Sequence, residues 1–465
     1  MPADATSSKK GASTIDGLPP ERRRWAVAAI FAALAMASLD TAIANIALPA
    51  IAADLHVSPA DAVWVVNVYQ IALVASLLPL AALGEIVGHN RIYLGGLLLF
   101  TLASLACASA WSLQSLLAAR VLQGLGAAGI MSVNTALIRF VYPERMLGRG
   151  YGHNAMVVAT AFTLGPTIAS GILALGPWTW LFAVNIPFGV SAILIGIKTL
   201  PHTPRAAHAF DFPGALLTAG SVGLFVLGIG SAAHKSTPAL VLLELIAGVL
   251  LGWLLIRRQA NHPAPMLPID LFRRPVFALS AATAICSFAV QGLAFVALPF
   301  YLEDILGRTQ VETGFLMTPW PLVVALMAPV AGRLSDRYPA GVLGGLGLVL
   351  LGLGMVLLAL LPANPGIANI VWRMAVCGCG FGFFQAPNMK ALMSSAPAGR
   401  SGGASGIVAT ARLTGQTTGA ALAALCFGLA GRDGATLALA LGSGFAAIGS
   451  VMSFLRLIAA PSPKV

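Results

Sequence analysis

The chain has 465 residues, of which 58% are hydrophobic and only 9% are charged. Soluble domains carry about 25% charged residues, whereas this chain repeats apolar runs of roughly 20 residues, the length that an α-helix needs to cross about 30 Å of hydrocarbon. These features exclude a water-soluble globular protein, and the uninterrupted runs exclude a membrane β-barrel, whose strands alternate apolar and polar residues.

The apolar runs predict an all-α integral membrane protein with fourteen membrane-spanning helices. Residues 1–24 are expected to form a disordered tail, and the basic run at 22–24 to anchor a retained first span. The expected spans are 25–49, 61–83, 92–110, 114–138, 150–174, 180–198, 213–232, 239–256, 276–302, 312–332, 341–362, 369–393, 404–430 and 435–456.

The first span contains the residue with the clearest potential for chemistry. Asp40 lies deep within it, where a charged carboxylate is costly and usually faces a polar cavity for a functional reason. Burial in hydrocarbon favours the protonated form of a carboxyl group, so an acid at this depth is suited to load and release protons. The alternative is a static structural partner for an arginine.

A short inner loop follows the second span. It contains an acid, Glu85, at the end of one helix and a base, Arg91, at the start of the next, with glycines at Gly84 and Gly88. Such a pair is expected to latch the inner ends of two helix bundles in one conformation, with a solvated turn as the alternative. Asp336 and Arg337 occupy the corresponding loop after the tenth span.

The fourth and fifth spans carry two further conformational or coupling candidates. Arg120 lies at a depth similar to that of Asp40, so a charge pair between them is expected in one state of the protein. Gly165 and Pro166 fall in mid-span, where the missing backbone donor predicts a kink, a hinge or a tight packing seam.

Polar and aromatic residues inside the spans are candidates for lining a substrate cavity. Any single one of them could instead pack between helices or face lipid. The candidates are Asn45, Asn67, Tyr69, Gln70, Gln123, Asn134, Gln291, Phe295, Phe384, Gln385, Asn388, Arg412 and Gln416.

The sequence also contains an internal repeat. Arg373, Gly378 and Gly380 in the twelfth span echo the pattern around Arg120 in the fourth, and the loop at 332–337 echoes the loop at 81–88. This predicts two six-helix bundles at 25–198 and 276–456, flanking a midplane cavity. A linker with two extra helices would fill 199–275, and a short tail 457–465.

Charge distribution gives the expected orientation and excludes a nucleic-acid partner. The net charge is +11, but most of the 27 Lys and Arg residues fall in the tails and in every second loop. This bias predicts that both termini are cytoplasmic. The five cysteines lie in apolar spans without metal-ligand spacing, so no metal, cofactor or disulfide is expected.

Four segments together make the chain resemble the major facilitator superfamily, and within it the fourteen-span drug:proton antiporter branch. They are residues 39–49, 120–128, 165–166 and 178–189. The resemblance implies alternating access by two rocking bundles, proton entry from outside and export of lipophilic, often cationic compounds. It also implies a multi-pass protein of the bacterial cytoplasmic membrane that works as a monomer with the proton gradient as its energy source.

Two departures from the family pattern bear on specificity. Asn67 stands where many relatives carry an acid in the second span, so neutral or anionic substrates become more plausible. The inner loop has Glu85 for the usual Asp, with His89 and Asn90 in place of basic residues.

The favoured function is therefore proton-coupled export of several unrelated toxic compounds, with small molecules, protons and lipid as partners. An exporter dedicated to one metabolite, antibiotic or amino acid is the main alternative, and a membrane sensor that does not transport is a remote one. No nucleophile, base and orienter set and no phosphate-binding loop supports an enzyme.

Overall fold

The computed structural model describes residues 17–143, 146–205, 210–233, 237–260, 269–335, 337–362, 364–395 and 401–459. Within these ranges, thirteen continuous helical stretches are long and apolar enough to cross a membrane. The last of them, Ile407–Ala459, holds two helices on either side of a short 3-10 turn. The described ranges thus contain the predicted fourteen helices of membrane length.

The helices of the first part of the chain match the first six predicted spans. Two of these spans begin with a short helical turn, α2 and α7, before the main helix. The elements are α1 (Pro20–Asp54), α2 (Pro59–Ala62), α3 (Trp64–Val87), α4 (His89–Ala108), α5 (Leu113–Val141), α6 (Leu147–Leu175), α7 (Trp180–Ala183) and α8 (Asn185–Thr199).

The remaining helices match the other eight spans. They are α9 (Phe212–Ala233), α10 (Pro238–Ala260), the 3-10 helix η2 (Ile269–Arg273), α11 (Pro275–Phe300), the π-helix η3 (Tyr301–Ile305), α12 (Gln310–Met317), α13 (Pro319–Leu334), α14 (Ala340–Ala359), α15 (Ile367–Ser395), α16 (Ser401–Ala430), the 3-10 helix η4 (Gly431–Asp433) and α17 (Gly434–Ala459).

Local sequence signals fix several helix ends. Ser112 accepts a hydrogen bond from the backbone N–H of Ser115 at 3.2 Å and so caps the start of α5. Thr309 and Glu312 form a reciprocal capping box at the start of α12. Gly88 turns the chain between α3 and α4 with φ of +112°, a conformation that side-chain-bearing residues rarely adopt.

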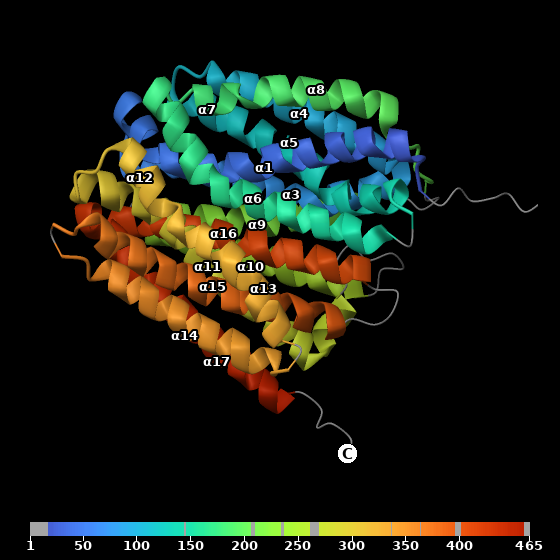
Figure 1. Ribbon diagram of the computed structural model, residues 1–465. Coiled ribbons are helices and arrows are strands. Elements are labelled where there is room, and N and C mark those ends of the chain that lie inside the picture. The colour runs from blue at the N-terminus through green and yellow to red at the C-terminus, as the bar shows by residue number, and fades with distance from the viewer. Residues whose placement is uncertain are drawn as a thin grey trace, which may run out of the picture.

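The two halves of the chain pack their helices in the same pattern. In the first half α5 packs on α3 and α4, and α1 packs on α6 and α8; in the second half α15 packs on α13 and α14, and α11 packs on α16 and α17. Figure 1 shows the helices running side by side, with the blue-to-green first half above the yellow-to-red second half.

Glycines at equivalent positions make equivalent contacts in both halves. A Cβ on Gly126 would lie 2.5 Å from the backbone nitrogen of Phe100, and one on Gly380 would collide with the backbone nitrogen of Leu351. Close helix approach through small residues is common in membranes. The repetition of this detail across half the chain supports the internal duplication inferred from the sequence.

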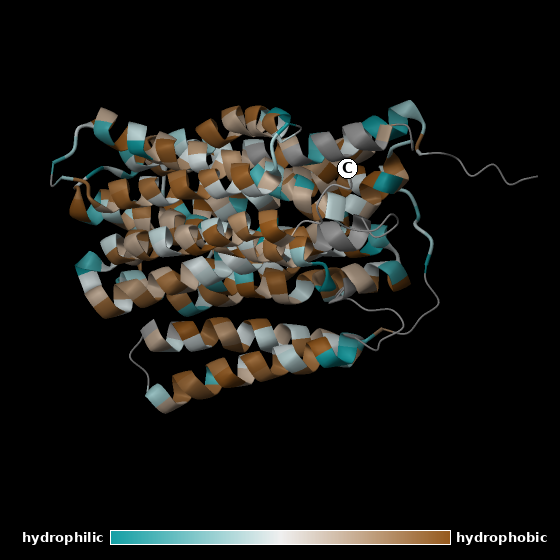
Figure 2. Cartoon of the chain, turned by 90° about the horizontal axis from the view of Figure 1, so that it is seen from below, coloured by the Kyte–Doolittle hydropathy of each residue, from teal (hydrophilic) through white to brown (hydrophobic). Residues whose placement is uncertain are grey.

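Helices α9 and α10 stand apart from this pattern. They pack mainly on each other, and α9 also contacts α3 from the first half and α16 from the second. Leu242, Leu243, Ile246 and Val249 of α10 are all more than half exposed. Figure 2 shows apolar residues along the helix bodies and hydrophilic ones mostly toward their ends, the distribution that a bilayer requires.

Candidate functional site

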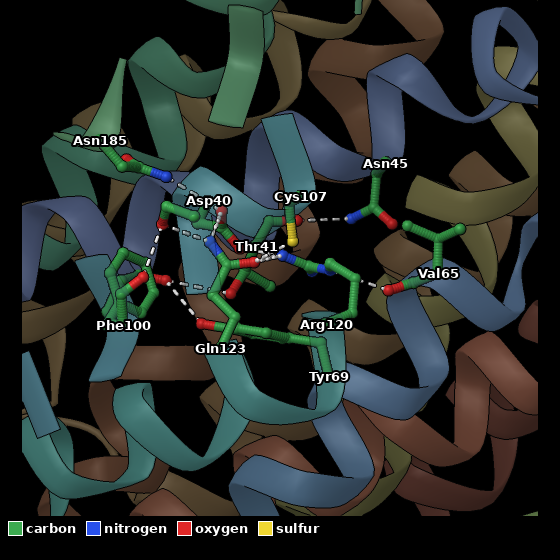
Figure 3. A network of polar contacts seen from close by, with 12 residues as sticks. Asp40, Thr41, Asn45, Val65, Tyr69, Phe100, Cys107, Arg120, Gln123 and Asn185 are labelled. Atoms are coloured by element: carbon green, nitrogen blue, oxygen red, sulfur yellow. Dashed lines mark hydrogen bonds and ion pairs between the residues drawn. The ribbon is translucent and has the colours of Figure 1, made fainter. Parts of the chain in front are cut away.

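The centre of the first half contains a buried ion pair. Asp40 of α1 and Arg120 of α5 approach to 2.5 Å between Oδ2 and Nη1, and their side chains are 1% and 0% exposed. Figure 3 shows the two side chains pointing toward each other among groups from neighbouring helices. A charge pair without water is costly unless hydrogen bonds satisfy the remaining polar atoms, so the surrounding groups matter.

Arg120 is held from several directions. Its Nε donates to the carbonyl oxygen of Val65 at 3.0 Å, and its Nη1 also donates to Oε1 of Gln123 at 2.6 Å. The guanidinium carbon lies 4.1 Å from the ring centroid of Tyr69, a cation–π arrangement. Nη2 has no hydrogen-bond partner in the described part of the chain, so the cation is incompletely satisfied there.

Asp40 accepts hydrogen bonds from two neutral amides in addition to the arginine. Gln123 Nε2 donates to Oδ1 at 2.9 Å, and Asn185 Nδ2 of α8 donates to the same oxygen at 3.2 Å. Gln123 Nε2 also lies 2.9 Å from the hydroxyl of Ser104 on α4. Three donors aimed at one carboxyl group suit its ionised form. Protonation of Asp40 would therefore weaken several contacts together.

A chain of polar residues connects this site to the interface between the halves. Thr41 and Asn45 follow Asp40 on α1, and with Gln70 of α3 they line a small space of about 20 Å³. Gln291 and Gln416 of the second half line the same space, and Gln416 Nε2 donates to Gln291 Oε1 at 2.9 Å.

Two larger cavities lie between the halves. One of about 270 Å³ is lined by Phe162, Trp320 and Phe381, among others; the other, of about 240 Å³, includes Leu34, Asn134 and Leu392. The two share a wall, formed by Asn154, Val158, Phe288, Gln385, Met389 and Arg412.

These two cavities reach toward one end of the bundle. Leu34 lies between Asp40 and the start of α1, so the second cavity extends toward the end that carries both chain termini, called the terminal end below. At the opposite end, Thr167 and Thr318 share a hydrogen bond of 2.8 Å, and the Ser170 hydroxyl donates to the carbonyl of Gln310 at 3.3 Å. The halves are therefore in contact at the opposite end.

Most of the predicted cavity residues line these spaces. The small space is lined by Asn45, Gln70 and Phe295. Two residues, Gln291 and Gln416, line both the small space and the 270 Å³ cavity. The 240 Å³ cavity is lined by Asn134, Phe384 and Asn388, and its wall shared with the 270 Å³ cavity includes Gln385 and Arg412.

Three predicted cavity residues lie elsewhere. Tyr69 and Gln123 contact Arg120 and belong to the ion-pair site instead, because α3 and α5 turn these faces inward toward α1 and α4. Asn67 is fully buried, and within the described ranges neither of its amide atoms has a hydrogen-bond partner. It lines none of the three spaces.

The predicted conformational residues have mixed surroundings. A Cβ on Gly165 would lie 2.5 Å from the Cβ of Ala42, so α6 packs tightly on α1 two residues from Asp40. Pro166 lies within a continuous α6, and its carbonyl accepts from Ser170 at 3.0 Å.

The residues of the predicted latch lie at the terminal end. A Cβ on Gly84 would lie 2.7 Å from a Val133 methyl group, so α3 and α5 approach closely there. Arg91 and Arg337 are exposed and make no ion pair within the described residues, and Asp336 lies outside those residues. Glu85 follows directly on Gly84 near the end of α3, with Gly88 as the turn into α4.

Sequence reasoning missed a second polar cluster in the other half. Arg456 of α17 is 3% exposed and donates to Asn388 Oδ1 at 2.7 Å and to the Ser280 hydroxyl at 3.0 Å. Sequence analysis did not single out Arg456. Its position at the end of α17, where α11, α14 and α15 converge, became visible only from the packing.

Comparison with known proteins gives the same general picture as the fold. The family model described as Major Facilitator Superfamily matches residues 30–420. The chain is 49% identical over 446 residues to the uncharacterized transporter YebQ of Escherichia coli (strain K12), covering 95% of this chain and 97% of that protein.

Two more distant relatives have more informative names. The multidrug resistance protein Stp of Mycobacterium tuberculosis (strain CDC 1551 / Oshkosh) is 33% identical, covering 84% of this chain and 73% of Stp. The riboflavin transporter RibZ of Clostridioides difficile (strain 630) is 30% identical, covering 84% of this chain and 85% of RibZ.

Proposed function

Because this chain belongs to the Major Facilitator Superfamily, a family of membrane transporters and not of enzymes, we propose that it is a proton-coupled antiporter that exports small lipophilic compounds. Asp40 is the proton carrier in this proposal, and Arg120 is its charge partner. The observation that carries it is the fully buried ion pair, linked through Thr41 and Asn45 to the cavity between the halves. The multidrug resistance protein among the relatives supports the direction and breadth of transport.

The proposed cycle couples the protonation of Asp40 to rocking of the two halves. A proton on Asp40 neutralises the carboxylate, weakens its contacts with Arg120, Gln123 and Asn185, and leaves the arginine to find other acceptors. Since α1 packs directly on α6 and α11, a shift of α1 changes the contact between the halves. Alternating access then follows from two packing arrangements of one interface.

The orientation completes the proposal. In this proposal the terminal end, where basic residues concentrate, faces the cytoplasm, and the similarity to YebQ of a bacterium supports the bacterial cytoplasmic membrane as the location. The cavity that reaches toward the terminal end would then admit substrate from the cytoplasm, with the opposite end closed.

Substrate-driven proton release from purified protein tests the role of Asp40. Wild-type protein in weakly buffered solution is expected to release protons when an exported compound is added, and Asp40→Asn to release none. The asparagine keeps the size and one acceptor for Arg120 but removes the counter-charge, so the melting temperature is measured to confirm that the variant is folded.

Asp211→Asn is the matched control. Asp211 is buried at 6% exposure and pairs with Arg258 at 2.9 Å, but it lies at the start of α9, away from the cavity. This variant should release protons like the wild type. Full proton release by folded Asp40→Asn would remove Asp40 from the mechanism.

An exporter dedicated to a single compound is the second candidate, and the riboflavin transporter among the relatives favours it. A susceptibility panel in an efflux-deficient bacterial host separates the two. Protection against several unrelated compounds supports multidrug export, and protection against one compound supports a dedicated exporter.

A further inference from the structure

Arg412 is a cation without a counter-ion. It lies on α16 in the wall shared by the two larger cavities, and it forms no hydrogen bond or ion pair within the described part of the chain. Its Nε atom is buried and has no hydrogen-bond partner among those residues. An unpaired charge in a membrane interior is costly and usually marks a functional site.

The surrounding helices cannot supply the missing negative charge. The sequences of α5, α6, α11, α13, α15 and α16 contain no Asp or Glu. Asp40 of α1 is already paired with Arg120. Among the described residues that line the two larger cavities, Arg412 alone is charged, so the space between the halves carries an unbalanced positive charge.

A second unpartnered donor belongs to a residue of the same lining. Trp320 of α13 is 0% exposed and lines the larger cavity, and its Nε1–H has no hydrogen-bond partner among the described residues. Both atoms can only donate hydrogen bonds, so the residues around the cavity have an excess of donors and a positive charge, which favours a ligand with acceptor oxygens. An exported cation would instead add repulsion from Arg412.

Much of the remaining lining is apolar and aromatic. The rings of Phe288 and Phe381 meet edge to face with centroids 5.4 Å apart, and Phe295 and Trp320 meet similarly at 5.5 Å. Such a wall binds a flat apolar body through burial and ring contacts. The amides of Gln385 and Gln416 add polar contacts of either kind.

We infer that the cavity between the halves binds organic anions, with Arg412 holding a carboxylate or similar anionic group and the aromatic wall holding an apolar ring. This inference rests on the proposed transport function, since it names the class of compound that the transporter carries. The bidentate geometry of a guanidinium suits a planar carboxylate.

Equilibrium binding of three matched probes to the full-length purified protein tests the inference. The probes are 1-naphthoate, 1-naphthamide and 1-naphthylmethylammonium, which share one ring system and differ in charge. Titration calorimetry on the wild type should show naphthoate binding roughly tenfold or more tightly than either of the other two, because only naphthoate gains a charge-assisted contact.

Variants at Arg412 identify the source of the preference. Arg412→Gln should abolish the preference for naphthoate while leaving naphthamide binding within about threefold, a difference too small for a lost charge-assisted bond. Arg412→Lys keeps the charge without the planar fork and should retain part of the preference. It also keeps the test open if the glutamine variant does not fold. Arg257→Gln, an exposed cation on α10, is the matched control and should bind like the wild type.

Three results would overturn the inference: wild-type binding of the amide or the ammonium as tight as that of naphthoate, no saturable naphthoate binding at millimolar concentration, or an unchanged preference in folded Arg412→Gln. The binding test does not involve proton coupling. Proton release by Asp40→Asn would therefore contradict the proposed role of Asp40 in antiport without affecting the evidence for the anion site. A failed binding test would contradict the anion site without affecting the proposed role of Asp40.

Discussion

Burying the ion pair of Asp40 and Arg120 inside a membrane helix bundle costs free energy, because both charges lose their contact with water. Removing one partner of a buried pair commonly costs about 3–5 kcal/mol, whereas replacing both by apolar residues is often neutral. Stability alone therefore gives little reason for the pair. Its polar neighbours, Gln123, Asn185 and Ser104, come from three helices and together hold the carboxyl group in one orientation.

Replacement of Arg120 should change the pH dependence of transport. In Arg120→Ala, Asp40 loses its nearby cation, the protonated carboxyl group becomes more favourable, and proton release requires a higher pH. We expect lower transport activity and a pH–activity profile displaced upward, measured as substrate efflux from proteoliposomes across a pH series.

The control for this change is Arg258→Ala. Arg258 also pairs with an aspartate, but its side chain is 43% exposed and it lies on α10. Its profile should match that of the wild type. An unshifted profile in folded Arg120→Ala would show that the arginine does not act on the proton carrier.

The sequence predicted the two charged residues of this site but not their neighbours. Asp40 and Arg120 are conspicuous because charges are rare in apolar spans, and helix rise alone places them at similar depth. The roles of Gln123 and Asn185 depend on how α5 and α8 are rotated about their axes. Small rotations of helices that are apolar on all sides leave no clear periodic signal.

At the level of elements, the close packing of α6 on α1 joins the proposed proton site to the interface between the halves. Gly165 brings the two backbones together beside Ala42, two residues after Asp40. Further along α6, Thr167 and Ser170 contact the second half. We therefore expect movement of α6 to shift both the part of α1 beside Asp40 and the contact with the second half.

A larger side chain at Gly165 should disturb this seam. In Gly165→Val the new methyl groups would meet Ala42, and overpacking of this kind costs about 1–3 kcal/mol. We expect a lower melting temperature and a loss of most efflux activity, measured on purified and reconstituted protein.

Gly171→Val tests whether any bulky residue on α6 has this effect. A Cβ at Gly171 meets no atom within 4 Å, so the substitution should be tolerated. Equal loss of activity in both variants would mean that contact with Ala42 is not the cause.

Helix positions were predictable from the sequence to within a few residues, because bilayer thickness sets their length. The π-helix at Tyr301–Ile305 and the short turns α2 and α7 were not. They change the hydrogen-bond pattern without changing hydropathy, and so composition does not reveal them. The Arg412 site was predicted only as one of many polar candidates, since its isolation from acids depends on which helices surround it.

In the molecule as a whole, we propose that a charge change within one half drives a rearrangement between two similar halves. The contacts at Thr167 and Thr318 close the opposite end, while the cavity reaches toward the terminal end. A transporter needs both this arrangement and its converse, with protonation shifting the balance between them.

Infrared difference spectroscopy of the purified transporter can follow the charge state of Asp40. Titration across neutral pH should reveal a carbonyl stretching band of a protonated carboxyl group that is absent in Asp40→Asn and present in Asp211→Asn. Addition of an exported compound at a pH where this group is protonated should reduce the band as the proton is released. If Asp40 keeps one charge state throughout, with and without substrate, then it is not the proton carrier and its charge does not drive the rearrangement.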